Sequence, residues 1–204
     1  THLAVDALII RGKKNFRNHA AYKNGLFEIQ DVSSQLVATM LQVEPGMSVT
    51  DACAGAGGKS LHLAAIMHNK GSIFALDVNE KKLKELESRA QRSGISIIKT
   101  KVASPGNTGG LFETADRLLL DVPCSGLGVL RRKPDTKWSL TPEKLSELNA
   151  LQQQLLNDYS KMLKSGGIMV YSTCSILPSE NQDQIARFLA TNSSFSLVGD
   201  RTIS

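Results

Sequence analysis

The sequence predicts an α/β protein built on a Rossmann-like, doubly wound and mostly parallel sheet. Apolar runs typical of strands alternate with amphipathic stretches typical of helices, and this alternation favours a parallel sheet. A glycine-rich turn follows the first apolar run, and polar or reactive residues follow several of the others. The length of 204 residues fits one such domain with a small appendage.

Five short apolar runs are the expected strands. In chain order they lie at 48–52, 72–77, 95–99, 117–121 and 168–172. The fourth, "RLLLD", is almost entirely apolar, which is typical of a strand covered on both faces. Because open α/β sheets bind ligands at the carboxyl ends of their strands, a site is expected among the residues that end these runs. Those residues are Asp51, Asp77, Asp121 and Cys174.

The first two helices between these strands are expected at 61–67 and 79–94, where apolar residues have helical spacing. Asn79 is the expected N-cap of the second, and Gly94 can end it.

The two later helices carry their own start signals. Thr141 and Pro142 form a cap followed by the residue favoured at the first helical position, and Gly166 is expected to end this helix. Ser179 and Gln182 have the spacing of a capping box for a last helix.

The N-terminal region, residues 1–30, differs from the rest. "ALIIRG" (7–12) and "LFEIQD" (26–31) resemble short strands around a basic segment, so we expect a small extended or hairpin subdomain. Residues 31–204 then form the main domain, which begins with a helix from about Asp31 to Val43.

Composition excludes several classes of protein. No apolar run reaches the roughly 18 residues of a membrane span, so we expect no membrane contact. The three cysteines have no metal-ligand spacing and the four histidines form no ligand pattern, so we expect no metal. An odd, low cysteine count favours a reducing cytoplasm, and we expect a monomer there. The net charge of +5 is compatible with a polyanionic partner but does not establish one.

The stretch "DACAGAGGKS" (51–60) joins the first strand to a helix. Gly55, Gly57 and Gly58 would let the backbone approach a ligand and take positive φ values, although their spacing matches neither common nucleotide-binding motif. Asp77, at the end of the second strand, stands where a carboxylate accepts hydrogen bonds from ribose hydroxyls. The plainer alternatives are a tight turn and an acid at a helix N-terminus.

Two cysteines lie in loops after strands. In "DVPCSGLG" (121–128), proline and two glycines indicate a rigid loop that presents Asp121 and Cys124, and "STCS" (172–175) follows the fifth strand. Simple packing of a buried thiol is the alternative. The next segment suits phosphates and a stacked base, unless it is an ordinary solvated loop. Its candidate RNA-binding residues are Arg131, Arg132, Lys133, Lys137 and Trp138.

These motifs together resemble the RsmB/NOP2/Sun family of S-adenosylmethionine-dependent RNA cytosine-5 methyltransferases. The matching stretches are "LFEIQDVSSQL", "DACAGAGGKS", "DVPCSGLG" and "STCSILPSEN", in that order, and "LRRKPDTKW" resembles the bacterial ribosomal RNA branch. The resemblance covers roughly residues 20 to 192. It implies methylation of a cytosine in RNA, with ribosomal RNA favoured over transfer RNA.

The resemblance also implies a role for particular residues. Cys174 is similar to the nucleophile, Cys124 to the cysteine that helps to release the product, and Asp121 to the acid that contacts both the target cytosine and the methyl donor. Lys59 is expected near that base. The residues expected to bind the cofactor are Cys53, Ala54, Gly55, Ala56, Gly57, Gly58, Lys59, Asp77 and Asp121.

Chemistry gives each thiol a purpose. Attack of a thiolate on C6 of cytosine makes C5 nucleophilic, and the proton left on C5 must depart before the bond to sulfur breaks. Lys59 and the basic segment are expected to lower the pKa of Cys174. The target base must be unstacked or single-stranded to expose C6.

Three features depart from the family pattern. Residues 99–107, "KTKVASPGN", lack the acid that usually follows the third strand, and Ala56 stands where proline is common. Beyond the last helix at most one strand, near 195–198, is expected, so the usual C-terminal hairpin is incomplete. These departures leave open a non-catalytic RNA-binding or assembly factor with the same fold, and the glycine turn leaves open a nicotinamide enzyme.

Overall fold

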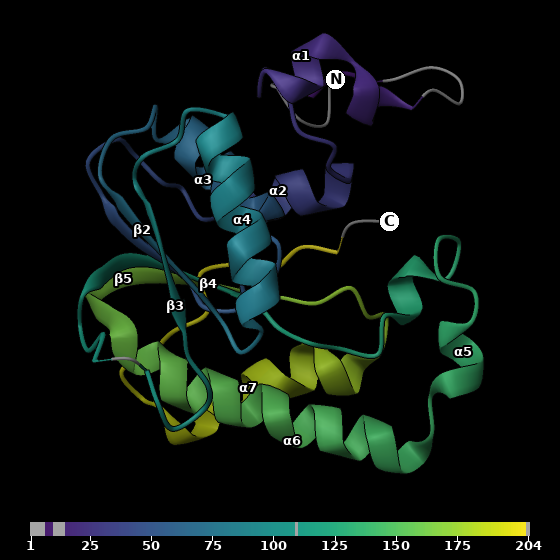
Figure 1. Ribbon diagram of the computed structural model, residues 1–204. Helices are drawn as coiled ribbons and strands as arrows, with labels where there is room; N and C mark the ends of the chain where they lie inside the picture. The colour runs from purple at the N-terminus through teal and green to yellow at the C-terminus, as the bar shows by residue number, and fades with distance from the viewer. Residues whose placement is uncertain (1–6, 10–14, 109, 203–204) are drawn as a thin grey trace.

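The computed structural model describes residues 7–9, 15–108 and 110–202, and these residues form the expected Rossmann-like fold (Figure 1). They contain a five-stranded, fully parallel sheet with the order β3-β2-β1-β4-β5. The strands are β1 (Ser48–Asp51), β2 (Ser72–Asp77), β3 (Ile98–Val102), β4 (Ala115–Asp121) and β5 (Leu163–Ser172). The chain order reverses between β1 and β4, which is where open α/β sheets form a ligand-binding crevice.

Helices cover both faces of the sheet (Figure 1). One face carries α2 (Val32–Met40), α3 (Gly58–Ile66) and α4 (Glu80–Arg92), and the other carries α6 (Pro142–Tyr159) and α7 (Gln182–Thr191). Two short helices, α1 (Ala20–Lys23) and α5 (Thr136–Ser139), lie away from the sheet. The 3-10 turns are η1 (Phe16–Asn18), η2 (Leu127–Val129), η3 (Ser160–Met162) and η4 (Pro178–Glu180).

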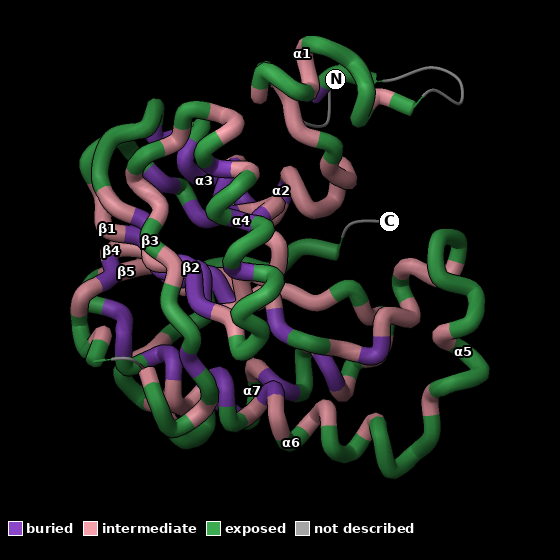
Figure 2. Tube along the Cα trace, viewed as in Figure 1, coloured by how far each residue is buried: buried purple, intermediate pink, exposed green. Residues whose placement is uncertain are grey.

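Strand β4 shows how the core fixes this arrangement. Leu118 and Leu120 pack in one cluster with residues of α6 and α7, whereas Leu119 packs in another with residues of α2 and α3. All three are fully buried, which confirms the prediction that this strand is covered on both faces. Burial of each leucine contributes about 2 kcal/mol. Figure 2 shows the buried sheet at the centre and the exposed segment around α5 projecting from it.

Two predicted helix boundaries are wrong. The helix that begins at Thr141 ends at Tyr159 rather than Gly166, because the chain passes through η3 and enters β5 at Leu163. Leu163 pairs with Ala115 and Ile168 with Arg117 of β4, and Gly166, with a φ of 75°, lies in the irregular stretch of β5 between these pairs. The capping box at Ser179 is not formed either, since Asn181 is the N-cap of α7 and Ser179 lies in η4.

Two more elements are displaced along the chain. The third strand begins at Ile98 rather than Ile95, because the Ile95 amide donates to the Ala90 carbonyl and closes the end of α4 around Gly94. Ile95 then packs beside α3 and α4 instead of pairing in the sheet. Helix α3 begins earlier than predicted, at Gly58, directly within the glycine turn.

Of the two short strands expected near the N-terminus, the second, at 26–31, is wrong. Residues 26–31 form no strand, and the basic segment before them contains η1 and α1. Residues 10–12 of the other expected strand lie outside the described residues. Glu28 forms ion pairs with Arg89 and Arg92 of α4, which attaches this region to the main domain. The division at residue 30 stays a prediction.

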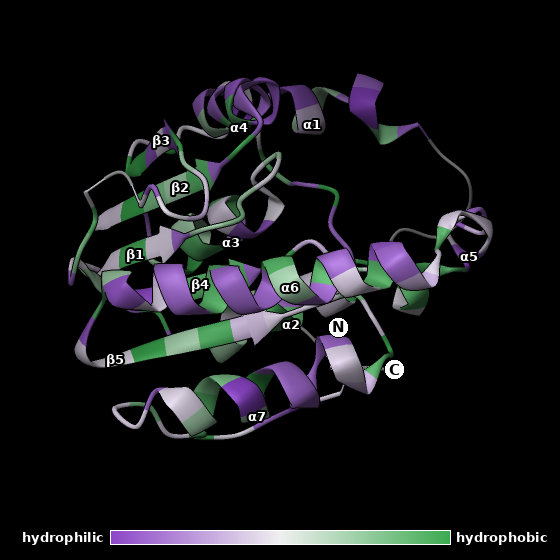
Figure 3. Cartoon of the chain, turned by 90° about the horizontal axis from the view of Figure 1, so that it is seen from below, coloured by the Kyte–Doolittle hydropathy of each residue, from purple (hydrophilic) through white to green (hydrophobic). Residues whose placement is uncertain are grey.

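Residues 195–198 form no strand, which agrees with the expectation of at most one strand beyond the last helix. Figure 3 shows that α4 carries mostly hydrophilic residues, as a helix exposed on one side should.

Among the helices that the structure describes, none is both long enough and apolar enough to cross a bilayer.

Candidate active site

The glycine turn after β1 takes the conformation that its sequence predicts at two of three positions. Gly55 has a φ of 55° and Gly57 a φ of 83°, both in the left-handed region that favours glycine, whereas Gly58 is the first residue of α3. A Cβ atom on Gly57 would lie 1.9 Å from Cδ1 of Leu86 in α4. Gly57 is therefore required both for its backbone angle and for close packing.

Asp77 holds this turn against the end of β2. One carboxylate oxygen accepts a hydrogen bond of 2.9 Å from the Gly55 amide, and the other accepts one of 2.8 Å from the Asn79 amide. The side chain remains partly exposed, so its remaining lone pairs can accept hydroxyl hydrogens from a sugar. Val78, next to it, and Val102, its neighbour on β3, are both exposed and offer an apolar surface at the same edge.

A cavity of about 110 Å³ lies between α2 and the glycine turn. Its lining includes Gln30, Ser34, Asp51, Cys53, Lys59 and Asp121. Two buried polar atoms of these side chains have no hydrogen-bond partner, namely Nε2 of Gln30 and Oδ1 of Asp51. An unpaired donor and an unpaired acceptor fit a ligand that carries both acceptor and donor groups, such as an amino acid end.

Asp51 is fully buried, and this burial raises its pKa to about 6. Its Oδ2 accepts a hydrogen bond of 2.6 Å from Ser60 in α3, which opposes the effect of burial. Burial also raises the pKa of the Cys53 thiol far above its usual value, with Asp51 and Asp77 adding to the effect. Cys53 therefore stays protonated and is no nucleophile.

Asp121 connects the two halves of the site. Its Oδ2 accepts from Nζ of Lys59 at 2.5 Å, and its Oδ1 accepts from the Ser172 hydroxyl at 2.7 Å. Ser172 is the direct neighbour of Asp121 in the register between β4 and β5. Lys59 also reaches Ser34 of α2 at 3.5 Å. Lys59 of α3 and Ser172 of β5 thus fix this carboxylate beside the cavity.

The two cysteine loops meet at this edge of the sheet. The sulfur atoms of Cys124 and Cys174 are 3.1 Å apart, and the Cys174 amide donates to the Cys124 sulfur at 3.2 Å. Cys174 is exposed and Cys124 is half-buried. Gly126 turns the first loop with a φ of 73°. The Gly128 amide donates to the Cys174 carbonyl at 2.9 Å, and a Cβ atom on Gly128 would collide with that carbonyl oxygen.

The two thiols have opposite pKa shifts. A hydrogen bond from Cys124 lowers the pKa of Cys174 to about 7, against the effect of partial burial. The same hydrogen bond, together with burial, raises the pKa of Cys124. Lys59 also lowers the pKa of Cys174, but less than Cys124 does. The expected effect of a cation on this pKa is therefore present but is not the main cause. Cys174 is thus the thiolate of the pair and Cys124 the proton donor.

A buried carboxylate that the sequence did not single out lies behind the thiols. Glu180 is fully buried, and it accepts hydrogen bonds from both the amide and the hydroxyl of Ser125, the residue after Cys124. Burial alone would raise its pKa, but the donors of Ser125, Ser175 and Gln152 hold the pKa of Glu180 below its usual value. Next to it, the Asn181 side chain accepts from the Thr173 hydroxyl and donates to the Ser175 and Leu177 carbonyls, on both sides of Cys174.

The basic segment after the first cysteine loop is exposed, as expected. Arg131, Arg132, Lys133, Lys137 and Trp138 all lie on the surface, in and around the projecting segment that carries α5 (Figures 1 and 2). The Trp138 side chain is 79% exposed, and the Lys137 ammonium lies 4.6 Å from its ring centroid. Arg132 forms an ion pair with Asp31 at the start of α2, which attaches the base of this segment to the main domain.

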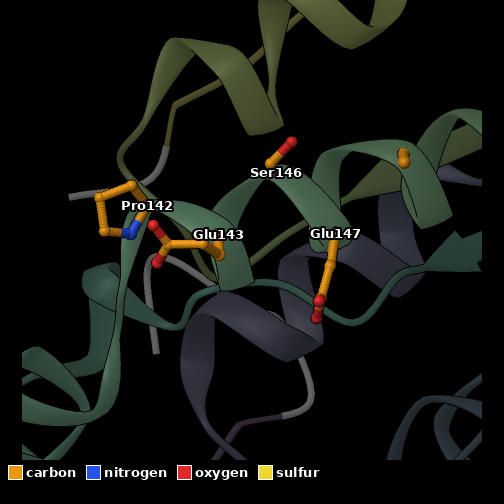
Figure 4. A pocket seen from close by; sticks show the side chains of 5 residues that line it. Pro142, Glu143, Ser146 and Glu147 are labelled. Carbon is orange, nitrogen blue, oxygen red and sulfur yellow. The ribbon is translucent and has the colours of Figure 1, made fainter.

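A second, shallow hollow of about 620 Å³ lies on the outer face of α6. Figure 4 shows Pro142, Glu143, Ser146 and Glu147 along it. Its two glutamates would repel RNA phosphates, and it contains no member of the thiol pair. Within the described part of the chain, no group of three or more histidine, cysteine or acidic residues could hold a metal ion.

The structure therefore brings together Cys124, Cys174, Asp121 and Lys59, and it places the glycine turn and Asp77 along the same edge. Sequence reasoning noted Asp51 only as one of the strand-end acids and did not single out Gln30, Ser34, Ser172 or Glu180. Asp51 could have been found from its place at the end of β1, and Glu180 from the quoted stretch "STCSILPSEN". Gln30 and Ser34 lie in the matching stretch "LFEIQDVSSQL", but nothing in that stretch predicts a cavity, because only the packing of α2 brings them to it.

Comparison with known proteins adds a family. Residues 38–203 match the family model described as 16S rRNA methyltransferase RsmB/F. A relative from Bacillus subtilis, named probable ribosomal RNA small subunit methyltransferase B, is 41% identical over 176 residues, which is 85% of this chain and 39% of the relative. One from Shewanella oneidensis, named ribosomal RNA small subunit methyltransferase B, is 37% identical, covering 92% of this chain and 44% of its own. The chain thus spans about two fifths of the length of these relatives.

Solved structures agree with the fold. NSun6 from Pyrococcus horikoshii, crystallised with SFG, has a TM-score of 0.80 and 27% identity, covering 88% of this chain and 46% of its own. A methyltransferase homolog protein from Pyrococcus horikoshii has a TM-score of 0.76 and 35% identity, covering 89% and 56%.

Proposed function

This chain belongs to the 16S rRNA methyltransferase RsmB/F family, and we propose that it transfers a methyl group from S-adenosylmethionine to C5 of a cytosine in RNA, with ribosomal RNA as the favoured substrate. The observation that carries the proposal is the pair of thiols 3.1 Å apart at the rim of the sheet. One of them is exposed and has a pKa of about 7, as a nucleophile at neutral pH requires.

The residues of the glycine turn and the cavity fit the cofactor. Asp77 offers its carboxylate to the ribose, and Val78 and Val102 offer an apolar surface to the adenine in place of the acid missing after β3. The unpaired Asp51 oxygen and Gln30 amide suit the ammonium and the carboxylate of the methionine end. When bound, S-adenosylmethionine would supply an electrophilic methyl group to this site.

Cys174 and Asp121 have different roles in the reaction with cytosine. The Cys174 thiolate attacks C6, and the added electron density makes C5 able to accept a methyl group. Asp121, held by Lys59 and Ser172, accepts a hydrogen bond from the N4 amino group and so orients the base for attack. These donors keep the Asp121 carboxylate in one orientation while the base changes charge.

Release uses the second thiol. The hydrogen bond to Cys174 is the largest cause of the raised pKa of Cys124, and this cause is removed once Cys174 is bonded to carbon. Cys124 can then lose its proton to solvent and accept the proton from C5. The electrons of the C5–H bond form the C5–C6 double bond, and the Cys174 sulfur leaves with its bonding pair.

The projecting basic segment supplies contacts to RNA. Lys133 and Lys137 can pair with phosphates, and the exposed Trp138 ring can stack on a base. The segment follows directly after the Cys124 loop, and the Gly128 amide donates to the Cys174 carbonyl, so RNA contacts on it would begin close to the thiols.

A trapping experiment tests the proposal. The Cys124→Ala variant, incubated with 16S rRNA or a fragment of it and S-adenosylmethionine, should accumulate a covalent protein–RNA complex with methylated cytosine, because release is blocked. Cys174→Ala should form neither the complex nor 5-methylcytosine. Transfer RNA in place of ribosomal RNA tests the alternative substrate. RNA binding without adduct or methylation in any variant would reject an enzyme and leave an RNA-binding factor.

A further inference from the structure

The Cys124 loop and the Cys174 loop are separated by 50 residues, and the sheet alone does not set the distance between their sulfurs. The register of β4 and β5 ends at Asp121 and Ser172, two or three residues before each cysteine. Beyond that point both chains run as loops without strand pairing. Something other than the strands must hold the thiols at contact distance.

Glu180 makes the contacts that could do so. One oxygen accepts from the Ser125 amide at 2.8 Å, and the other accepts from the Ser125 hydroxyl at 2.5 Å. Gln152 of α6 donates to the first oxygen at 3.0 Å and to the Pro123 carbonyl at 3.0 Å. Pro123 and Ser125, on the two sides of Cys124, are therefore hydrogen-bonded to Gln152 and to Glu180.

The same carboxylate belongs, along the chain, to the other loop. Glu180 lies in η4, six residues after Cys174, and the Tyr171 hydroxyl at the end of β5 donates to its backbone carbonyl at 2.8 Å. The hydroxyls of Ser125 and Ser175, each the residue after its cysteine, are 3.1 Å apart. Glu180 thus connects the segment that carries Cys174 to the residue that follows Cys124.

Burial of the Glu180 carboxylate has a free-energy cost. A carboxylate with no exposed surface loses its hydration, and hydrogen bonds from the protein must replace it. No lysine or arginine is paired with Glu180 among the described residues, so neutral donors alone compensate its charge. A glutamine could make similar contacts, because the Ser125 hydroxyl can turn to accept from the amide.

We propose that Glu180 is a positioning residue that holds Cys124 against Cys174 through its hydrogen bonds to Ser125. The role of Glu180 in catalysis rests on the proposed function. Its effect on the distance between the two thiols does not depend on RNA. The carboxylate touches neither substrate nor reacting atoms, and it acts only by fixing the Cys124 loop.

The experiment measures the proximity of the thiols without RNA or cofactor. The full chain is equilibrated in buffers of reduced and oxidised glutathione, and the Cys124–Cys174 disulfide is counted by alkylation and mass spectrometry. Two glutathione thiols are released for each disulfide formed, so the equilibrium gives an effective concentration of one thiol near the other. Glu180→Ala should lower it about tenfold or more, because without the carboxylate the Ser125 amide and hydroxyl no longer hold the Cys124 loop in place.

Conservative and neighbouring variants separate positioning from general loosening. Glu180→Gln should stay within about threefold of the wild type, because hydrogen-bonding groups are kept while the charge is lost. Tyr171→Phe removes the hydroxyl that supports the Glu180 backbone but leaves the carboxylate, and it should change the effective concentration less than Glu180→Ala does.

Each outcome decides the proposal. An unchanged effective concentration in a folded Glu180→Ala variant, or an equal fall in Tyr171→Phe, would overturn it. If Glu180→Ala does not fold, Ser125→Ala carries the test, and it should give a smaller but clear fall by removing one of the bonds. Failure of RNA methylation in the wild type would reject the proposed function and leave this measurement unaffected.

Discussion

The ends of β1 and β2 and the ends of β4 and β5 form one continuous edge, but they are held in different ways. At the first pair, backbone groups determine the shape of the site. Gly55 and Gly57 take positive φ values, and the Asp77 carboxylate accepts hydrogen bonds from the backbone amides of Gly55 and Asn79. At the second pair, side chains from distant parts of the chain meet, and the Cys124 loop is tied to Glu180.

This difference suits what each half must do. A turn fixed by glycine angles and amide hydrogen bonds presents backbone groups to a cofactor at close range. In the proposed reaction Cys174 bonds to a base and later separates from it, and its exposed position beyond the strand pairing leaves room for that change. The following predictions test whether the first half depends on glycine backbone angles and buried packing, and the second on hydrogen bonds between side chains.

The largest expected effect is on the first half. Gly57→Ala should lower the free energy of unfolding by about 3 kcal/mol, because it combines a left-handed backbone angle with a collision against Leu86. Gly55→Ala is the matched control: its φ is also positive, but a Cβ there meets nothing within 4 Å, so about 1 kcal/mol is expected. Urea unfolding of both variants measures the difference, and equal losses would contradict this account of the packing.

The second prediction concerns Asp51. Its pKa is raised to about 6 in the folded protein from 3.8, so the folded state holds this proton more tightly than the unfolded state does. Stability from this group is therefore present below pH 3.8 and is lost as the pH rises to about 6. Asp51→Asn should remove that loss and raise the free energy of unfolding at pH 8 by about 2 kcal/mol.

Urea unfolding of wild type and Asp51→Asn at pH 5 and pH 8 checks the sign. The gain should be larger at pH 8, and binding of S-adenosylhomocysteine should weaken in the same variant, since the unpaired carboxylate oxygen is lost. A variant that is less stable than the wild type at pH 8 would refute the argument from burial.

The smallest expected effect concerns the thiols. The rate of Cys174 alkylation by iodoacetamide should rise with pH through a midpoint near 7, because the thiolate is the reactive form. Cys124→Ala removes the hydrogen bond that is the main cause of this low pKa, so the midpoint should move up toward about 8.5. At pH 7 the rate should then fall roughly tenfold.

The change Cys53→Ala is the control for this profile. Cys53 lies in the cofactor half, and its substitution should leave the Cys174 midpoint in place. Peptide mapping by mass spectrometry reports each cysteine separately. A midpoint that does not move in Cys124→Ala would show that the thiol contact has no influence on Cys174.

Much of the fold could be predicted because its signals are local. Asn79 accepts hydrogen bonds from Lys81 and Lys82, and Thr141 accepts one from Lys144, as their places before helices predict. Predictions failed where a tertiary contact competed with a local signal. Ile95 reads as strand but closes α4, and Gly166 reads as a helix end but lies in β5 because pairing with β4 begins at Leu163.

By itself, the sequence determined the alternation of strand and helix, the glycine turn, and the residues that end each strand, since these depend on groups a few positions apart. Only the tertiary structure decided that the sulfurs of Cys124 and Cys174 are in contact and that Glu180 and Asp51 are buried beside the site. The physical reason is that parallel register and helix packing bring together residues tens of positions apart. The pKa of a thiol or carboxylate depends on the neighbours and the burial that this packing supplies.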